Sequence, residues 1–165
     1  MIQKGSFNWD KYLKECLEST AYCSLATVGS RGIWSNPVYF AYDKNYNLYF
    51  ISMPSSLHMQ NIKKNPNIAV SIYNTNQDTH GDVFGIQLEG KASILTDDEV
   101  VLAHKIYYRR AYPDGKHNKK PEENMGDKTK WRFVKIIPSS IYYFDTRFFG
   151  EERQEVPLGV YMGVY

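Results

Sequence analysis

The segment Leu48–Pro66 brings hydroxyl groups, an imidazole and a helix start together in a short stretch of chain. An apolar run ends at Ser52, Ser55 and Ser56 follow, and His58 lies just inside a predicted helix. The first turn of a helix has backbone N–H groups without intrahelical partners and carries the positive end of the helix dipole. Such an end binds anions, phosphate groups among them. The pattern therefore predicts an anion site at this point.

Each of these side chains also has a simpler interpretation. Ser55 and Ser56 can be helix N-caps, which is the commoner role of serine before a helix. His58 can be a surface histidine. It can also donate a hydrogen bond to a phosphate group, because its ordinary pKa is about 6.5 and a dianion favours the charged ring. Capping and anion binding both use the helix start, so the two interpretations are compatible.

Other patterns of catalytic or metal-binding residues are missing from the sequence. There is no Ser-His-Asp arrangement, no HExxH motif and no glycine-rich phosphate loop. Cys16 and Cys23 form no CxxC and have no nearby histidine pair, so we expect reduced core thiols and no metal site. Any reaction of this chain would then depend on a bound cofactor.

The length and charge indicate an ordinary globular protein. A chain of 165 residues can build one hydrophobic core, and we expect residues 1–165 to form a single domain. A net charge of +2 is too small to indicate a nucleic-acid partner. The sequence has no apolar leader and no run of about 18 apolar residues, so we expect no membrane contact and a cytoplasmic location.

Three helices are predicted. The first begins behind Ser6 or Asn8 and has apolar residues at helical spacing, and the second covers 55–64, before Asn65-Pro66. The third runs from a capping box at Thr96–Glu99 to about Tyr112. The stripe of the third helix expected to pack on the sheet consists of Leu102, Ala103, Ile106 and Tyr107.

The strands are predicted at 21–28, 33–43, 47–52, 68–75, 83–95, 131–138 and 141–146, with a polar loop over 113–129. Pro37 interrupts the second strand and predicts an edge or a bulge there. We expect Trp34 and Trp131 in the core. Sequential strands joined by short turns predict a mainly β fold with flanking helices, whose mostly antiparallel sheet closes into a small barrel.

Three stretches of sequence together resemble one family, the flavin-binding split barrels related to pyridoxamine 5'-phosphate oxidase. They are SNPVYFAYDKNYNLYFISMPSSLHMQNIKKNPNIAVSIY, FGIQLEGKASIL and WRFVKIIPSSIYYFDTRFFG. The resemblance extends from Ala21 to about Glu155 and is greatest to small bacterial members that also have a histidine at the position of His58. It implies an FMN-binding split β-barrel, with FMN held between the two subunits of a homodimer.

The resemblance also implies roles for individual residues. Asn36, Pro37 and Val38 match a strand segment along the edge of the isoalloxazine ring. Ser52 and Ser56 match hydroxyls near the phosphate, with Ser55 beside them. His58 and Leu57 occupy the positions of a basic pair that grips the phosphate. Phe144 stands where the oxidase has a tryptophan near the flavin.

The sequence departs from the oxidase at several of these positions. Asn36 replaces an arginine, Leu57 and His58 replace the basic pair, and Gly85 stands where glutamine is expected. We therefore predict an FMN-dependent oxidoreductase of unknown substrate that is not a working pyridoxamine 5'-phosphate oxidase. The alternative is a non-catalytic protein that stores or senses flavin or haem.

Two further expectations concern the partner subunit. Apolar strands at 38–42 and 141–144 hold more apolar surface than one barrel interior, which favours a dimer. Arg109 and Arg110 either close an anion site across the interface or bind the carbonyl groups at a helix C-terminus.

Overall fold

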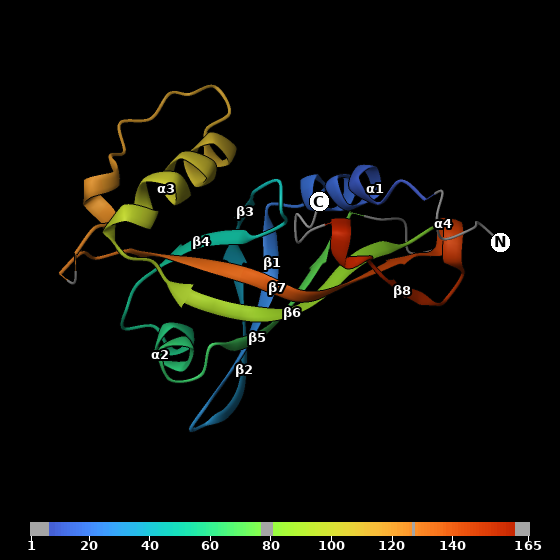
Figure 1. Cartoon of the computed structure of the whole chain (residues 1–165), viewed down its shortest axis with the longest axis horizontal. Coiled ribbons are helices and arrows are strands. Elements are labelled where there is room, and N and C mark those ends of the chain that lie inside the picture. The colour runs from blue at the N-terminus through green and yellow to red at the C-terminus, as the bar shows by residue number, and fades with distance from the viewer. Residues whose placement is uncertain (1–6, 77–80, 127, 161–165) are drawn as a thin grey trace.

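The computed structural model describes residues 7–76, 81–126 and 128–160 (Figure 1). Its strands are β1 (Tyr22–Gly29), β2 (Gly32–Tyr39), β3 (Ala41–Tyr42), β4 (Leu48–Ser52), β5 (Asn67–Tyr73), β6 (Phe84–Ile94), β7 (Arg132–Asp145) and β8 (Arg153–Glu155). Its helices are α1 (Trp9–Glu18), α2 (Leu57–Lys64), α3 (Asp97–Ala111) and α4 (Thr146–Phe149), with the 3-10 helices η1 (Pro121–Asn124) and η2 (Leu158–Val160). The strands form one sheet, and its pairings are antiparallel.

The sheet curls so that the edge strand β2 contacts β4, next to the other edge. The strand order is β2-β1-β5-β6-β7-β4-β3, with β8 added beside β7. The edge strands β2 and β3 follow each other in the chain, with only the buried Phe40 between them. Curling brings the edges together and gives an interior that side chains can fill. The predicted fold, a mainly β split barrel with flanking helices, is confirmed.

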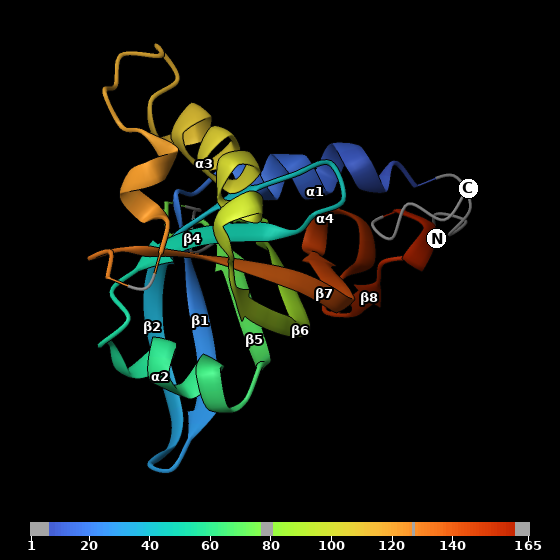
Figure 2. The same cartoon turned by 60° about the vertical axis from the view of Figure 1, so that its left-hand side comes forward.

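Strand β4 is buried on both faces, because its side chains alternate between two cores. Leu48 and Phe50 belong to the large core of the barrel, which α1 also covers. Tyr49 belongs to a smaller core that Val100 and Ala103 of α3 complete. Helices α2 and α3 accordingly lie on opposite sides of β4 and β7 (Figures 1 and 2).

Strand β7 corrects the prediction of two strands joined around Pro138. It is one continuous strand, and the ladder with β6 shifts register between Glu89 and Gly90, so that Gly90 pairs with Pro138 and Glu89 with Ser140. A bulge of this kind accommodates proline, which has no N–H to donate to the ladder. Gly90 is required there, because a Cβ atom at that position would lie 2.4 Å from the Ile137 carbonyl oxygen.

Helices α1 and α3 begin where the sequence predicts, α2 begins at Leu57, two residues later than predicted, and one residue of the predicted α3 stripe does not face the sheet. Asn8 caps α1 by accepting a hydrogen bond from the Lys11 N–H at 3.0 Å. The predicted packing of Leu102 is wrong, because that side chain is 57% exposed. Ala103 is buried and Ile106 and Tyr107 pack against the smaller core, as predicted, and Val100 and His104 are buried as well. One position along a helix turns the side chain by about 100°, so a small error in the stripe exposes a predicted core residue.

Other predictions about single residues are confirmed or corrected by burial. Pro37 lies on β2, an edge strand, as predicted. Trp34 and Trp131 are exposed, so their assignment to the core is wrong. Cys16 and Cys23 are free and buried, and burial raises the pKa of each thiol to about 12. Both thiols therefore stay protonated at neutral pH.

No helix among the residues described by the structure is both long and apolar enough to cross a lipid bilayer. That residues 1–165 form one domain remains a prediction.

Candidate functional site

Ser52, Ser56 and His58 come together at the end of β4 and the start of α2. His58 Nε2 lies 2.7 Å from Ser52 Oγ and 3.2 Å from Ser56 Oγ. The two hydroxyl oxygens are 3.2 Å apart. Ser52 is buried, while Ser56 and His58 are half-buried. Three polar side chains predicted to form an anion site are thus in mutual contact.

The start of α2 carries no capping side chain, although Ser56 occupies the N-cap position. The Ser56 hydroxyl has one hydrogen and donates it to the Met53 carbonyl oxygen at 2.8 Å. The N-cap role predicted for this side chain is therefore wrong. The first turn of α2 also has no acidic residue. Its backbone N–H groups and the positive dipole end remain available to an anion.

Helix α3 shows the opposite arrangement at its N-terminus. The Glu99 carboxylate accepts hydrogen bonds from the Thr96 N–H at 3.2 Å and from the Thr96 hydroxyl at 3.3 Å. Asp97 and Asp98 add two further acids to the first turn. Such an end repels anions. Of the two helix starts beside β4, α2 is the one suited to a negatively charged ligand.

The protonation of His58 depends on what the cluster contains. Burial lowers the pKa of His58, so the ring is neutral at neutral pH when nothing charged is beside it. A phosphate group would favour the charged ring and oppose the effect of burial. The cluster can therefore donate to an anion through the Ser52 hydroxyl, the imidazole and backbone N–H groups, whereas the Ser56 hydroxyl already donates to Met53.

The predicted flavin-facing segment lies on β2 next to this cluster. As an edge strand, β2 leaves part of its backbone unpaired, and it contacts both α2 and β4. Val38 points into the barrel core, while Pro37 is exposed on the outer face. The side-chain oxygen of Asn36 is buried and has no hydrogen-bond partner among the described residues. Such an unsatisfied acceptor is costly and marks a place where a ligand N–H could bind.

Two predicted cofactor residues lie away from the cluster. Ser55 is exposed and borders a shallow hollow of about 310 Å³ that Arg31 and Lys64 also line. Phe144 pairs with Gly85 near the far end of β7, whereas Ser52 pairs with Arg132 at its beginning. At about 3.3 Å per residue, these positions are about 40 Å apart along the strand. Phe144 cannot reach the Ser52 cluster of its own chain.

Arg110 binds carbonyl groups at a helix end, as one of the two interpretations predicted. The helix is α1, because Arg110 Nη2 donates to the carbonyl oxygens of Leu17 and Thr20. Its guanidinium group also lies 4.4 Å from the centre of the Phe40 ring. Arg110 is thus engaged within its own chain.

A second hollow, not predicted from the sequence, lies on the outer face of the sheet. It measures about 360 Å³, and Arg153 Nη1 donates to Gln87 Oε1 at 2.9 Å within it. The Arg153 guanidinium also lies 4.6 Å from the centre of the Tyr142 ring. Alternation along β6 could have placed Gln87 on this face, but no local pattern indicated β8, which carries Arg153.

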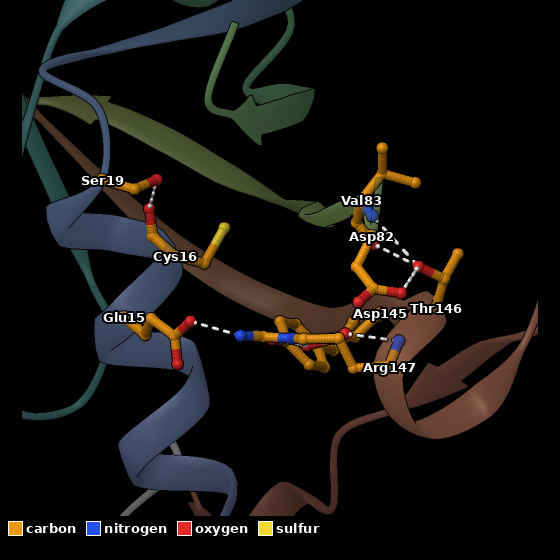
Figure 3. Close-up of polar contacts among 9 residues, drawn as sticks. Glu15, Cys16, Ser19, Asp82, Val83, Asp145, Thr146 and Arg147 are labelled. Carbon is orange, nitrogen blue, oxygen red and sulfur yellow. Dashed lines mark hydrogen bonds and ion pairs between the residues drawn. The ribbon is translucent and has the colours of Figure 1, made fainter. Parts of the chain in front are cut away.

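A densely hydrogen-bonded polar cluster surrounds the buried carboxylate of Asp145 (Figure 3). Arg147 donates to it through Nε at 2.9 Å and Nη2 at 2.7 Å, and Tyr143 donates its hydroxyl at 2.6 Å. Arg147 Nη1 also binds Glu15 of α1 at 2.7 Å. Every strong donor in this cluster is already engaged, so the cluster joins α1 to β7 and α4 and offers little to a ligand.

Sequence and structure comparisons identify similar proteins. Residues 10–143 match the family model described as pyridoxamine 5'-phosphate oxidase. A comparison with curated protein sequences finds no significant match.

Several solved structures share the fold. A heme binding protein from Mycobacterium smegmatis has a TM-score of 0.68 and 15% identity, over 90% of this chain and 57% of that one, so this chain spans less than two thirds of it. A pyridoxamine 5'-phosphate oxidase-related, FMN binding protein from Nostoc punctiforme has a TM-score of 0.63 and 16% identity, over 92% and 91% of the two chains. General Stress Protein 26 from Bacillus anthracis has a TM-score of 0.62 and 22% identity, over 91% and 100%.

Proposed function

Because the chain belongs to the pyridoxamine 5'-phosphate oxidase family, we propose that it binds FMN and acts as an FMN-dependent oxidoreductase on a small molecule. The observation that carries this proposal is the contact of Ser52, Ser56 and His58 at the uncapped start of α2. FMN would supply hydride and electron transfer, and the protein would bind and orient it and exclude water.

The donors and acceptors in this region suit the two ends of FMN. Hydroxyl, imidazole and backbone N–H donors at the start of α2 suit the phosphate. The unpaired oxygen of Asn36 on the neighbouring strand suits an N–H at the edge of the flavin ring. Together, the anion site and the unsatisfied acceptor support a phosphorylated, ring-bearing ligand.

The oxidation of pyridoxamine 5'-phosphate is not the reaction we propose. Asn36 and Leu57 are uncharged where the oxidase has basic residues. Without a cationic clamp, a phosphorylated substrate loses both affinity and positioning. Turnover of pyridoxamine 5'-phosphate by the FMN-loaded protein at ordinary enzyme rates would contradict this statement.

We propose that the functional unit is a homodimer, because apolar side chains are exposed on the outer face of the sheet. Alternate residues of the strands at 38–42 and 141–144, among them Phe40 and Tyr143, fill the chain's own core, so these strands leave less apolar surface for a partner than their composition suggests. Exposed apolar side chains also project from the outer face of β1, β2 and β5, where most of the neighbouring side chains are small. They are Tyr22, Val28, Ile33 and Tyr73. An exposed apolar face of this kind usually marks an interface.

A second copy would also complete the cofactor site. Phe144 and Arg153 lie at the end of β7 remote from Ser52, so only a symmetry-related subunit could bring such residues to the cluster. Ile33 is 79% exposed on the outer face, and Ile33→Glu should yield monomers that lose FMN. Val101→Glu on α3, at a residue 53% exposed, is the matched control. Light scattering would contradict the shared site if a stable monomer retained FMN at low micromolar concentration.

The second candidate is a non-catalytic protein that binds flavin or haem. The neutral state of His58 favours haem, because iron coordinates the neutral imidazole. We also propose a cytoplasmic location, which the two free thiols suit.

The absorbance spectrum of the purified protein separates these candidates. Oxidised flavin bands, with FMN identified by mass after release, are the expected result. A Soret band would identify the bound cofactor as haem and not FMN. A colourless protein that does not bind added FMN in calorimetry would contradict the proposed function.

A further inference from the structure

A cleft of about 540 Å³ lies between α3, η1 and the ends of β2, β4 and β7. Its volume falls within the range of about 300–1,000 Å³ that is typical of small-molecule sites. Most of its lining consists of aromatic side chains from four separate parts of the chain. These are Tyr22, Tyr39, Tyr107, Tyr108, Tyr112 and Trp131.

The rings pack against one another and leave faces open to the cleft. The Tyr39 ring lies 5.3 Å from Tyr107 and 5.8 Å from Tyr22, both nearly perpendicular to it. These contacts hold the tyrosines in place without covering them. Trp131 is 42% exposed and Tyr112 is 39% exposed, so large apolar surfaces remain uncovered. Aromatic faces held in this way favour a flat ring that can stack or pack edge to face.

The charged residues that line the cleft form one pair of opposite sign. Lys119 and Glu123 are the charged residues of the lining, and Lys119 Nζ lies 3.8 Å from Glu123 Oε2. Arg110, on the helix that forms one wall, is directed to the carbonyl groups of Leu17 and Thr20. The lining therefore offers no unpaired cation to a phosphate or carboxylate group, which would lose its hydration on entering.

The cleft begins where the predicted flavin-facing segment of β2 ends. Pro37 and Tyr39 are two positions apart on one strand, so their side chains share a face and lie within about 7 Å. A flavin along Asn36–Val38 would thus border the rings of the cleft. We propose that this cleft is the substrate pocket, and that its substrate is a flat, uncharged aromatic or heteroaromatic molecule. This inference rests on the proposed FMN site.

Three probe molecules with one carbon skeleton test the inference. They are 2-naphthol, which is flat and neutral; decahydro-2-naphthol, which has the same skeleton without aromatic rings; and 2-naphthyl phosphate, which is anionic. Their affinities are measured by calorimetry on the FMN-loaded protein and on the protein without FMN, with FMN affinity measured in parallel. We expect 2-naphthol to bind at least about fivefold more tightly than either analogue, because ring packing and neutrality both favour it.

Two variants test whether the bound probe lies in the cleft. Trp131→Leu and Tyr112→Leu should each weaken 2-naphthol by about 2- to 10-fold, as expected for the loss of one aromatic contact. Neither should alter FMN affinity. Leu102→Ala is the control, because Leu102 is an exposed apolar residue (57%) on α3 that does not line the cleft.

The outcomes separate the two proposals. FMN binding without 2-naphthol binding, or 2-naphthol binding that neither variant weakens, would overturn the substrate pocket alone. Preference for 2-naphthyl phosphate would overturn the uncharged substrate class. A protein that binds 2-naphthol in the cleft but does not bind FMN would overturn the proposed function and leave an aromatic binding site.

Discussion

The clusters at the two ends of β7 are both polar, but they differ in whether their donors and acceptors already have hydrogen-bond partners. At the Asp145 end, a fully buried carboxylate accepts from Arg147 and Tyr143, and Arg147 extends to Glu15 (Figure 3). At the other end, near Arg132, Ser52 and His58 contact each other beside a helix start that no side chain caps.

This difference distinguishes a structural cluster from a binding cluster. A buried charge whose hydrogen bonds are complete stabilises the arrangement of the elements it joins, and a ligand would have to displace those bonds. A buried and a half-buried hydroxyl beside free backbone N–H groups keep capacity for a ligand. The binding end should therefore tolerate mutation in the free protein, whereas the structural end should not.

The largest expected effect is at the structural end. Arg147→Met leaves the buried Asp145 carboxylate without its main partner, and removing one member of such a pair costs about 3–5 kcal/mol. Urea denaturation measures this loss in the free energy of unfolding. The double variant Arg147→Met with Asp145→Asn should recover part of it, since the buried charge is also removed. A loss below about 1 kcal/mol for the single variant would contradict the structural role.

At the binding end, the largest effect should appear in ligand affinity. Charge-assisted hydrogen bonds contribute roughly 1.5–3 kcal/mol each. Ser56→Ala with His58→Ala should therefore weaken FMN strongly but riboflavin little, because riboflavin has no phosphate. Calorimetry with both ligands measures the difference. Ser55→Ala should weaken FMN less, because Ser55 lies outside the cluster. Equal losses of affinity for FMN and riboflavin would show that the phosphate does not bind at this position.

A smaller effect should separate the two helix starts in the free protein. Thr96→Ala removes the N-cap hydroxyl of α3, which donates to the Glu99 carboxylate, and should cost about 1 kcal/mol of the free energy of unfolding. Ser56→Ala should cost less than about 0.5 kcal/mol, because Ser56 bonds to the Met53 carbonyl and does not cap α2. Thermal or urea unfolding of both variants tests this order, and equal losses would show that Ser56 acts as a cap.

The smallest effect should be a pH dependence caused by His58. Burial lowers its pKa below the ordinary value of 6.5, so the folded state binds fewer protons than the unfolded state. The resulting stability is fully present above pH 6.5 and is lost as the pH falls through that value towards the lower folded pKa. His58→Gln should reduce the pH dependence of the free energy of unfolding between pH 7.5 and 5.5. Saturating FMN should reduce it in the wild type as well, because a phosphate favours the charged ring. An unchanged slope in the variant would contradict the burial of a neutral ring.

Features that depend on neighbouring residues could be predicted from the sequence. The helix start at Thr96 and the turn Gly29–Gly32 are set by side chains within a few positions of one another. Ser52, Ser56 and His58 lie within one turn and one helix start, so their proximity followed from a local pattern. The order of the elements was enough for a family resemblance, which the family match confirms.

Features that depend on distant segments were decided by the tertiary structure. Arg147 and Glu15 are separated by 132 positions, and the pairing of Pro138 with Gly90 turned two predicted strands into one. The aromatic cleft likewise needs α3 to present Tyr107 beside Tyr39 of β2. A local pattern shows that a side chain is apolar or charged, but not which face of its element the rest of the chain will cover. That choice follows from the packing of the whole sheet, because each buried group must find its partners there.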